Sequence, residues 1–453
     1  MKKISLNLIF LIISVSVVVS GPKNRLTPET ALFSYIHNND KTFDWKVEKT
    51  ARIEGLSVYQ IVFTSQKWRN IDWRHELIVM VPQKVIHDEA LLFITGGAVK
   101  NNQPNLHRLD DGLIKSIGQI ALKNQAITSI IWQVPNQPLY GDLTEDALIS
   151  YTLHQFQGDR DFTWPLLFPM TKSAVRAMDV IQDFAKKEKN QKVKHFVVSG
   201  ASKRGWTTWL TGAMDKRVKA IGPMVIDVLN MPVNISYQKE VYGDYSEQIE
   251  DYVKLGLAQQ MSTGEGKDLI EMIDPYSYRK NLTMPKMIFM GTNDEYWTAD
   301  AIKNYIDDIP GNNHICYIPN AGHGMGDKTQ ALNTLNAFFG LTVNDEPYPV
   351  CNFKIAEENG KVHLIVSTSG DQLVNASLWS AGSVDQDFRN EKFSSKSLNT
   401  PGQPEVKVDL DLPDSGFKAF YVELTYKTKS GFEYTECTRM FVADANKVLV
   451  KRN

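Results

Sequence analysis

The amino-acid sequence predicts an α/β fold with a doubly wound, mostly parallel sheet, because strand-like and helix-like runs alternate along most of its length. Six short apolar runs have the composition of strands buried on both faces, at residues 76–82, 90–95, 126–132, 193–198, 220–226 and 286–290. Amphipathic runs predict helices at residues 111–123, 145–156, 171–185, 204–214, 300–306 and 328–339. Such alternation is typical of a parallel sheet that helices cover on both faces.

Two parts of the chain depart from this alternation. Residues 229–282 are polar, aromatic and acidic, and they predict a helical insertion between two core strands, a candidate lid. After residue 345 the pattern changes to that of a small β-sandwich, with short alternating strands at residues 362–366, 376–379, 406–410 and 419–424. We therefore expect a main domain at residues 21–344 and a C-terminal β-sandwich domain at residues 345–453.

The first twenty residues have the layout of a secretory signal peptide. Lys2 and Lys3 precede an apolar run at residues 8–19, and the small residue Ser20 ends it. We expect cleavage after Ser20 and a mature protein that is secreted or lies in the periplasm or cell envelope. The run is short for a membrane span, although an uncleaved anchor is the alternative, and no later segment is apolar enough to cross a bilayer. The mature chain is therefore not expected to be an integral membrane protein.

The charge balance narrows the class of partner. The formal net charge is -2 at pH 7 and no basic tract is present, so we expect no binding to nucleic acid or anionic membranes. Small molecules, glycan esters, peptides and a cell-surface receptor stay open as partners.

The cysteines and the sequons predict no catalytic or metal-binding site. Three cysteines, Cys316, Cys351 and Cys437, are too few for a disulfide framework and are not spaced as a metal site. We expect no metal and no cofactor, and a bridge between Cys351 and Cys437 stays open in an oxidising compartment. Three sequons are glycosylation sites if the source is eukaryotic, Asn234, Asn281 and Asn375.

The stretch Gly200-Ala-Ser-Lys-Arg-Gly205 lies between a predicted strand and a predicted helix. Hydrolases with a doubly wound sheet place a nucleophilic serine on such a turn, and small residues flank it because the turn is tight. Glycine stands two residues before Ser202, but Arg204 occupies the matching position after it. This pattern alone is common in ordinary turns, so Ser202 is a candidate nucleophile that needs partners elsewhere in the chain.

In these hydrolases an acid and then a histidine follow the serine along the chain. The histidines after Ser202 are His314, His323 and His363. His314 opens a predicted strand, which puts it at the wrong edge of the sheet, and His363 lies inside a strand of the C-terminal domain. His323 lies in a glycine-rich loop directly after a strand, where its imidazole can reach the serine. We therefore predict that His323 is the base.

Asp294 is the predicted acid because it follows the strand at residues 286–290 and leaves room for one helix and one strand before His323. A carboxylate there holds the histidine tautomer and stabilises the imidazolium. Asp227, at the end of the preceding strand, is the alternative acid. Each of these residues alone is more often structural, but their order and spacing together favour a Ser202, Asp294 and His323 triad.

An oxyanion that forms during acyl transfer needs two preorganised donors. The first is expected to be the backbone N–H of Lys203, directly after the serine. The second is expected in the loop that holds Gly96 and Gly97, because glycine permits close backbone approach. The side chains of Lys203 and Arg204 are expected to add positive charge near the same place.

The chain resembles the PhoPQ-activated pathogenicity-related protein family of bacteria and social amoebae. The resemblance lies in these segments: residues 72–77, 95–97, 134–138, 168–175, 198–207, 223–227, 291–297, 319–323, 378–381 and 387–389. It implies an α/β-hydrolase fold with the triad on Ser202, Asp294 and His323, and a secreted or envelope location. The resemblance also implies an architecture similar to that of prolyl-oligopeptidase-type peptidases, and amoebal members include secreted autocrine repressors of proliferation.

Two main functions follow as hypotheses. The first is a secreted serine hydrolase that acts by acyl transfer on an ester or peptide bond. The second is a secreted signalling protein, such as an autocrine proliferation repressor, on a hydrolase scaffold whose catalysis is dispensable. A third hypothesis makes the C-terminal sandwich a module that binds carbohydrate or protein.

Overall fold

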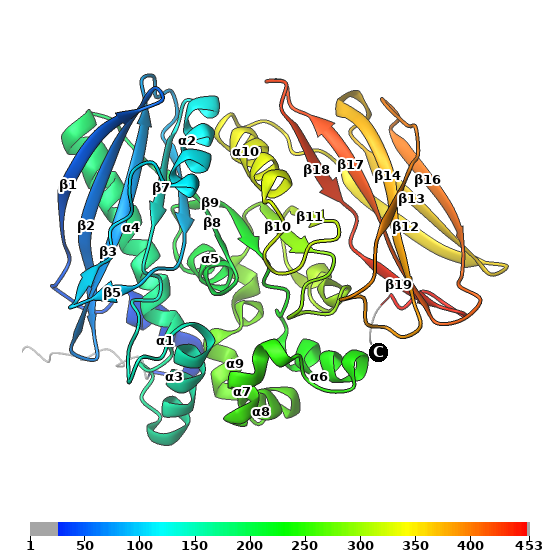
Figure 1. Cartoon of the computed structure of the whole chain (residues 1–453), viewed down its shortest axis with the longest axis horizontal. Helices are drawn as coiled ribbons and strands as arrows, with labels where there is room; N and C mark the ends of the chain where they lie inside the picture. The colour runs from blue at the N-terminus through cyan, green and yellow to red at the C-terminus, as the bar shows by residue number, and fades with distance from the viewer. Residues whose placement is uncertain (1–25, 451–453) are drawn as a thin grey trace, which may run out of the picture.

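The central sheet of the computed structural model, which describes residues 26–450, has nine strands in the order β1-β2-β3-β7-β4-β8-β9-β10-β11 (Figure 1). The six strands from β7 to β11 in this order run parallel, and β1, β2 and β3 form an antiparallel extension. Their bounds are Asp44–Ile53, Leu56–Trp68, Ile71–Pro82, Ile127–Ile131, Glu89–Ile94, His195–Ala201, Val218–Met224, Lys286–Gly291 and Asn313–Ile318. Every residue of β4, β7 and β10 is buried, as expected for strands covered on both faces.

Helices cover both faces of this sheet, as predicted for a doubly wound fold. On one face α1 (Pro28–Ile36), α4 (Leu167–Lys189) and α5 (Lys203–Met214) bury their apolar side chains in one hydrophobic core. On the other face α2 (Gly112–Asn124) and α10 (Thr329–Val343) form a second core. A short hairpin, β5 (Val99–Lys100) and β6 (Gln103–Pro104), follows β4. The chain therefore has the mixed, mostly parallel sheet of an α/β-hydrolase.

The structure corrects two sequence-based expectations about local structure. The strands β1 and β2 were not predicted, and β1 is an edge strand whose ten residues include no buried one, so no apolar run marks it. Residues 300–306 were expected as an α-helix but form two 3-10 turns, Ala301–Asn304 and Ile306–Asp308. There the buried polar side chains of Lys303 and Asn304 bond to Tyr237 and Asn234 of another segment, which competes with a regular helix.

Residues 229–282, which we call the helical insertion, connect β9 to β10. They form four short α-helices and two 3-10 turns: α6 (Met231–Tyr242), η1 (Glu247–Ile249), α7 (Glu250–Lys254), α8 (Leu257–Thr263), α9 (Lys267–Ile273) and η2 (Pro275–Asn281). Figure 1 shows α6 to α9 grouped beside α3 (Glu145–Asp159), below the central sheet. The insertion therefore lies at the end of the sheet where Ser202 follows β8.

The C-terminal part has two antiparallel sheets that share one core (Figure 1). One has the order β12-β13-β16, and the other β15-β14-β17-β18 with β19 paired to β17. Their bounds, from β12 to β19, are Cys351–Glu358, Lys361–Thr368, Leu373–Ser383, Ser394–Ser397, Glu405–Asp411, Phe417–Lys427, Glu433–Cys437 and Phe441–Asp444. Apolar residues of α10 join the same core, so these sheets are attached to the α/β unit.

The structure bears on the expected disulfide bridge, glycosylation sites and membrane spans, but not on the signal peptide. The three cysteines, all within them, are free thiols, so the bridge left open between Cys351 and Cys437 is not formed. The expected glycosylation at Asn234 is wrong, because that side chain is buried and bonds to Leu229 and Asn304, which leaves no room for a glycan. The expected signal peptide, residues 1–20, lies outside the described residues. Among residues 26–450, no helix is both long and apolar enough to cross a membrane.

Candidate active site

Ser202 sits on a sharp turn between β8 and α5. Its backbone has φ 59° and ψ -126°, in a region that residues other than glycine rarely occupy. A Cβ on Gly200 would meet the Ile94 carbonyl oxygen at 2.8 Å, and one on Gly205 would meet the Met224 carbonyl oxygen at 2.6 Å. The two glycines therefore let the turn pack directly against the neighbouring strands, and this strained turn points Ser202 out of the sheet.

Ser202, His323 and Asp294 form one hydrogen-bonded cluster, which we call the Ser–His–Asp cluster. Ser202 Oγ lies 2.8 Å from His323 Nε2. On the other side of the ring, His323 Nδ1 lies 2.9 Å from one oxygen of Asp294 and 3.1 Å from the other. The structure thus brings together all three residues that the sequence predicted as a triad, in the geometry that a nucleophile, a base and an orienting acid require.

The carboxyl of Asp294 is buried at the end of β10. Burial raises its pKa above the ordinary value, while the hydrogen bond to His323 and the charge of that ring act in the opposite direction. The Tyr296 backbone N–H also donates to it at 2.9 Å. The neighbouring Glu295 carboxylate accepts the backbone N–H of His323 at 2.7 Å, which fixes the start of the histidine loop.

Asp227, the alternative acid, lies in the chain after β9 and has a different environment. It is fully buried, and burial raises its pKa from 3.8 to about 8. One of its oxygens has no hydrogen-bond partner among the described residues. The hydrogen bonds of the His323 ring to a carboxyl go to Asp294 and not to Asp227.

Arg204 stands where many hydrolases have glycine, and its side chain pairs with a carboxylate on α3. Its guanidinium donates to both oxygens of Glu145 at 2.7 Å and to the Val134 carbonyl oxygen at 2.5 Å. Burial opposes the ionisation of Glu145, but the hydrogen bonds and charge of Arg204 outweigh it and lower the pKa of that carboxyl to about 2. The expectation that Arg204 adds free positive charge to the site is wrong, because the side chain is neutralised by this pair.

Gly96 is the place where Arg204 meets the expected oxyanion loop. A Cβ on Gly96 would lie 2.5 Å from the Arg204 guanidinium, which would then have to shift. Lys203 is the first residue of α5, and its backbone N–H is one of the helix N-terminal donors that have no intrahelical acceptor. The structure thus places Gly96 against the first turn of the nucleophile helix, while the oxyanion role of Lys203, Gly96 and Gly97 stays a prediction.

A second polar group, which the sequence did not predict, lies beside Ser202. Lys203 Nζ forms an ion pair of 2.6 Å with Asp146 on α3, so its charge is also neutralised. Tyr252 of the helical insertion donates to Asp146 at 3.0 Å, and Tyr296 does so at 3.4 Å. The Tyr296 ring in turn packs on His323 with ring centroids 4.1 Å apart. This group joins the insertion to the Ser–His–Asp cluster.

An apolar pocket opens next to Ser202, between the helical insertion and the sheet. Its wall consists of Asp146, Ser202, Lys203, Trp206, Ile226, Val228, Met231, Ile235, Ile249, Tyr252, Ala258, Met261, Tyr296 and Trp297. The nucleophile therefore faces a cavity that is almost entirely hydrocarbon.

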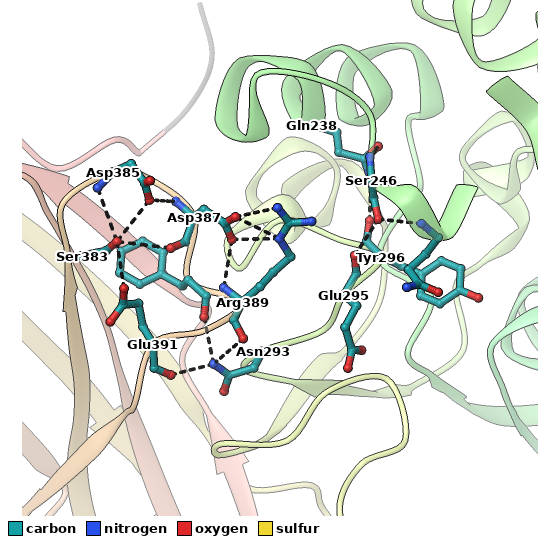
Figure 2. A network of polar contacts seen from close by, with 12 residues as sticks. Gln238, Ser246, Asn293, Glu295, Tyr296, Ser383, Asp385, Asp387, Arg389 and Glu391 are labelled. Atoms are coloured by element: carbon teal, nitrogen blue, oxygen red, sulfur yellow. Dashed lines mark hydrogen bonds and ion pairs between the residues drawn. The ribbon is translucent and has the colours of Figure 1, made fainter. Parts of the chain in front are cut away.

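A segment of the C-terminal part supports the loops of Asp294 and His323. This segment, residues 383–393, connects β14 to β15, and Figure 2 shows Asn293 reaching it from the acid loop. The Asn293 amide donates to the carbonyl oxygens of Phe388 at 2.8 Å and Glu391 at 2.7 Å. In the histidine loop, Asn320 exchanges two hydrogen bonds with the backbone of Phe393, at 2.8 and 3.0 Å.

One group in the described residues has the composition and spacing to hold a metal ion: Asp88, Glu89 and His195. It lies at the amino ends of β4 and β8, the end opposite to Ser202. Asp88 and Glu89 already form ion pairs with Lys194 and Lys219. This group therefore has no part in the chemistry at Ser202.

Comparison with known proteins decides the family. The family described as PhoPQ-activated pathogenicity-related protein matches residues 32–389. The chain belongs to this family. A relative, "Autocrine proliferation repressor protein A" of Dictyostelium discoideum, is 29% identical over an alignment that covers 90% of this chain and 88% of that protein.

Solved structures with similar folds are much more distant from this PhoPQ-related chain. Acetyl xylan esterase 1 from Thermoanaerobacterium sp. JW/SL YS485 is 14% identical with a TM-score of 0.47, over 70% of this chain and 92% of that one. A glucuronoyl esterase from Solibacter usitatus is 11% identical with a TM-score of 0.41, over 65% and 87%. Similarities this low carry no information on substrate.

Proposed function

We propose that this protein is a serine hydrolase that cleaves an ester or peptide bond by acyl transfer to Ser202. The supporting observation is the continuous line of hydrogen bonds from Ser202 Oγ through the His323 ring to the Asp294 carboxyl. His323 Nε2 takes the serine proton as Oγ attacks the carbonyl carbon, and the imidazolium then protonates the leaving group. Water next attacks the acyl-enzyme, with His323 again as base, and releases the acid product.

The remaining groups have supporting roles in this mechanism. Asp294 holds the proton on His323 Nδ1 and stabilises the imidazolium. The backbone N–H of Lys203, at the positive end of α5, and the loop of Gly96 and Gly97 stabilise the oxyanion.

A fluorophosphonate probe tests the nucleophile, because it reacts covalently only with an activated serine. We expect the wild type to be labelled and Ser202→Ala to lose all labelling. Ser199→Ala is the matched control, since Ser199 lies on the same strand but is buried and donates to the Gly222 carbonyl oxygen. Labelling that survives in Ser202→Ala, or that never occurs in folded wild type, contradicts the proposal.

The location of this hydrolase is proposed to be outside the cytoplasm. The support is the order of Lys2, Lys3, the apolar run at residues 8–19 and Ser20 at the start of the chain. Amino-terminal sequencing of the protein recovered from medium or envelope should begin at Gly21. Recovery of the uncleaved chain from the membrane fraction contradicts cleavage and favours an anchor.

A second function, secreted signalling without required catalysis, is favoured by the similarity to the proliferation repressor of Dictyostelium. In this case the hydrolase scaffold presents a surface to a cell-surface receptor. Purified wild type and Ser202→Ala are applied to proliferating cells of the source organism at equal concentrations. Equal inhibition by both proteins supports signalling alone, whereas loss of inhibition in Ser202→Ala ties the effect to hydrolysis.

A further inference from the structure

The apolar pocket borders the nucleophile but not the base. Its wall includes Ser202 and Lys203, whose backbone N–H is the expected oxyanion donor, but His323 contributes nothing to that wall. The leaving group must take a proton from His323 Nε2, so it lies on the histidine side of the carbonyl. The acyl part then extends to the other side, into the pocket.

We propose that this pocket binds the acyl part of the substrate and selects esters with short, uncharged aliphatic acyl groups. The proposal rests on the proposed hydrolase function and adds its substrate class. The apolar wall is formed by Trp206, Ile226, Val228, Met231, Ile235, Ile249, Ala258 and Met261. Each of these side chains is buried, with no more than 6% of its surface exposed. An aliphatic chain that enters therefore exchanges water for hydrocarbon contacts along its length.

The polar members of the wall disfavour a charged acyl group. Asp146 and Lys203, the two charged side chains that border the pocket, are paired with each other at 2.6 Å. Tyr252 and Tyr296 both donate to the same carboxylate. A free ammonium or carboxylate on the acyl part would lose its water in the pocket without gaining an unpaired partner, which is costly. Acyl groups with a free α-amine are therefore poor substrates.

The size of the pocket limits the length of the acyl chain. The cavity measures about 60 Å³. An apolar cavity of about 150 Å³ holds benzene, so this smaller one fits an acyl chain of about two to four carbons. Longer chains must displace side chains of the helical insertion.

The helical insertion sets this limit, because α6, η1 and α8 supply five of the eight residues of the apolar wall. Met231 and Ile235 come from α6, Ile249 from η1, and Ala258 and Met261 from α8. Met261 is the longest flexible side chain that α8 contributes, so it is the natural position at which to change the length of the pocket. Met272 on α9 is equally buried but does not border the pocket, so it serves as a matched position.

The test compares kcat/KM for p-nitrophenyl esters from acetate to decanoate. We expect each methylene that fits to raise kcat/KM up to about fourfold, with a maximum at butyrate or shorter and a fall of at least about tenfold by octanoate. Met261→Ala should move the maximum to a chain longer by about two to three carbons, since it removes three heavy atoms (Cγ, Sδ and Cε) from the wall. Met272→Ala should leave the maximum unchanged. Met261→Val is a milder variant if the alanine destabilises α8.

Failure of this proposal is distinguishable from failure of the proposed function. Fluorophosphonate labelling of each variant reports whether the Ser–His–Asp cluster is intact, whatever the acyl preference. A flat profile, or a maximum at octanoate or longer, in labelled wild type overturns the pocket assignment alone. A maximum that moves equally in Met261→Ala and Met272→Ala shows a general loosening of the insertion and also overturns it. Absence of labelling in folded wild type overturns the function itself.

Discussion

Ser202 takes its position from its immediate surroundings, whereas Asp294 and His323 are supported by a segment far along the chain. The turn at Ser202 depends on Gly200 and Gly205 packed against the neighbouring strands. Asn293, next to the acid, bonds to carbonyl oxygens that lie 95 and 98 positions later in the chain. Asn320, close to the histidine, bonds to Phe393, 73 positions later.

The two halves of the site therefore differ in the parts of the chain that hold them in place. The serine half lies within the α/β unit, where the turn between β8 and α5 packs against β4 and β9. The acid and histidine half is shared between the α/β unit and the 383–393 segment, so the C-terminal sheets take part in forming the site. Arg389 of that segment also packs over the ring of Tyr242 in the helical insertion, 3.8 Å from its centroid. A substitution in the C-terminal part is therefore expected to lower activity by displacing Asp294 and His323, while the position of Ser202 stays unchanged.

The largest effect is expected at the acid itself. Asp294→Asn keeps the shape of the side chain but places an amide against His323 Nδ1, which favours the wrong tautomer. We expect kcat to fall about 10⁴-fold. The matched change Asp227→Asn, on the neighbouring strand end, should lower kcat less than twofold. Single-turnover kinetics on a p-nitrophenyl ester measures the rate in both variants. An equal fall in both contradicts the assignment of Asp294.

Asp227→Asn should instead change stability, and the sign depends on pH. The folded protein keeps the Asp227 proton up to about pH 8, whereas the unfolded chain releases it near 3.8. Between these values the folded state binds more protons, so the free energy of unfolding decreases as pH rises through this interval. Asp227→Asn removes this loss, so the variant should be more stable than wild type at pH 8, on the order of a few kcal/mol.

Urea unfolding at pH 4 and pH 8 measures this difference. Near pH 4 the carboxyl is neutral in the folded state and partly neutral in the unfolded chain, so the two proteins should differ little there. A variant that is less stable than wild type at pH 8 contradicts the burial of a protonated Asp227.

The support from the C-terminal part is tested by Asn293→Ala. The change leaves the Phe388 and Glu391 carbonyl oxygens without their donor and frees the acid loop, which costs about 1–3 kcal/mol. We expect kcat to fall roughly 10- to 100-fold with KM nearly unchanged, because the loop positions Asp294 and does not touch substrate. Asn344→Ala, whose amide bonds only to Gly340 in its own helix, should leave kcat unchanged. A change confined to KM, or equal effects in both variants, contradicts a positioning role.

The sequence predicted the three residues of the Ser–His–Asp cluster but not the contacts that support the acid and histidine loops. The parallel strands were predictable because each is a short, largely apolar run, and Ser202, Asp294 and His323 follow such strands. The exposed edge strand β1 has no such apolar run. The amphipathic run at residues 300–306 predicted a helix but forms 3-10 turns, because its buried polar side chains bond to another segment. Asn293 and Asn320 were not predicted either, since their partners are backbone carbonyl and amide groups of residues 383–393. Backbone partners leave no pattern in side chains, so only the structure shows them.

The smallest effect is expected on the serine side, at Arg204. Arg204→Lys keeps the charge, but a single ammonium cannot bond to both Glu145 oxygens and to the Val134 carbonyl oxygen together. We expect kcat/KM to fall about threefold to tenfold, since the loop of Gly96 loses the guanidinium that packs against it. Arg108→Lys is the control, because Arg108 also bonds to both oxygens of a carboxylate, Asp110, but does so at the surface. If Arg108→Lys lowers kcat/KM as much as Arg204→Lys does, the buried pair has no particular role in holding the oxyanion loop.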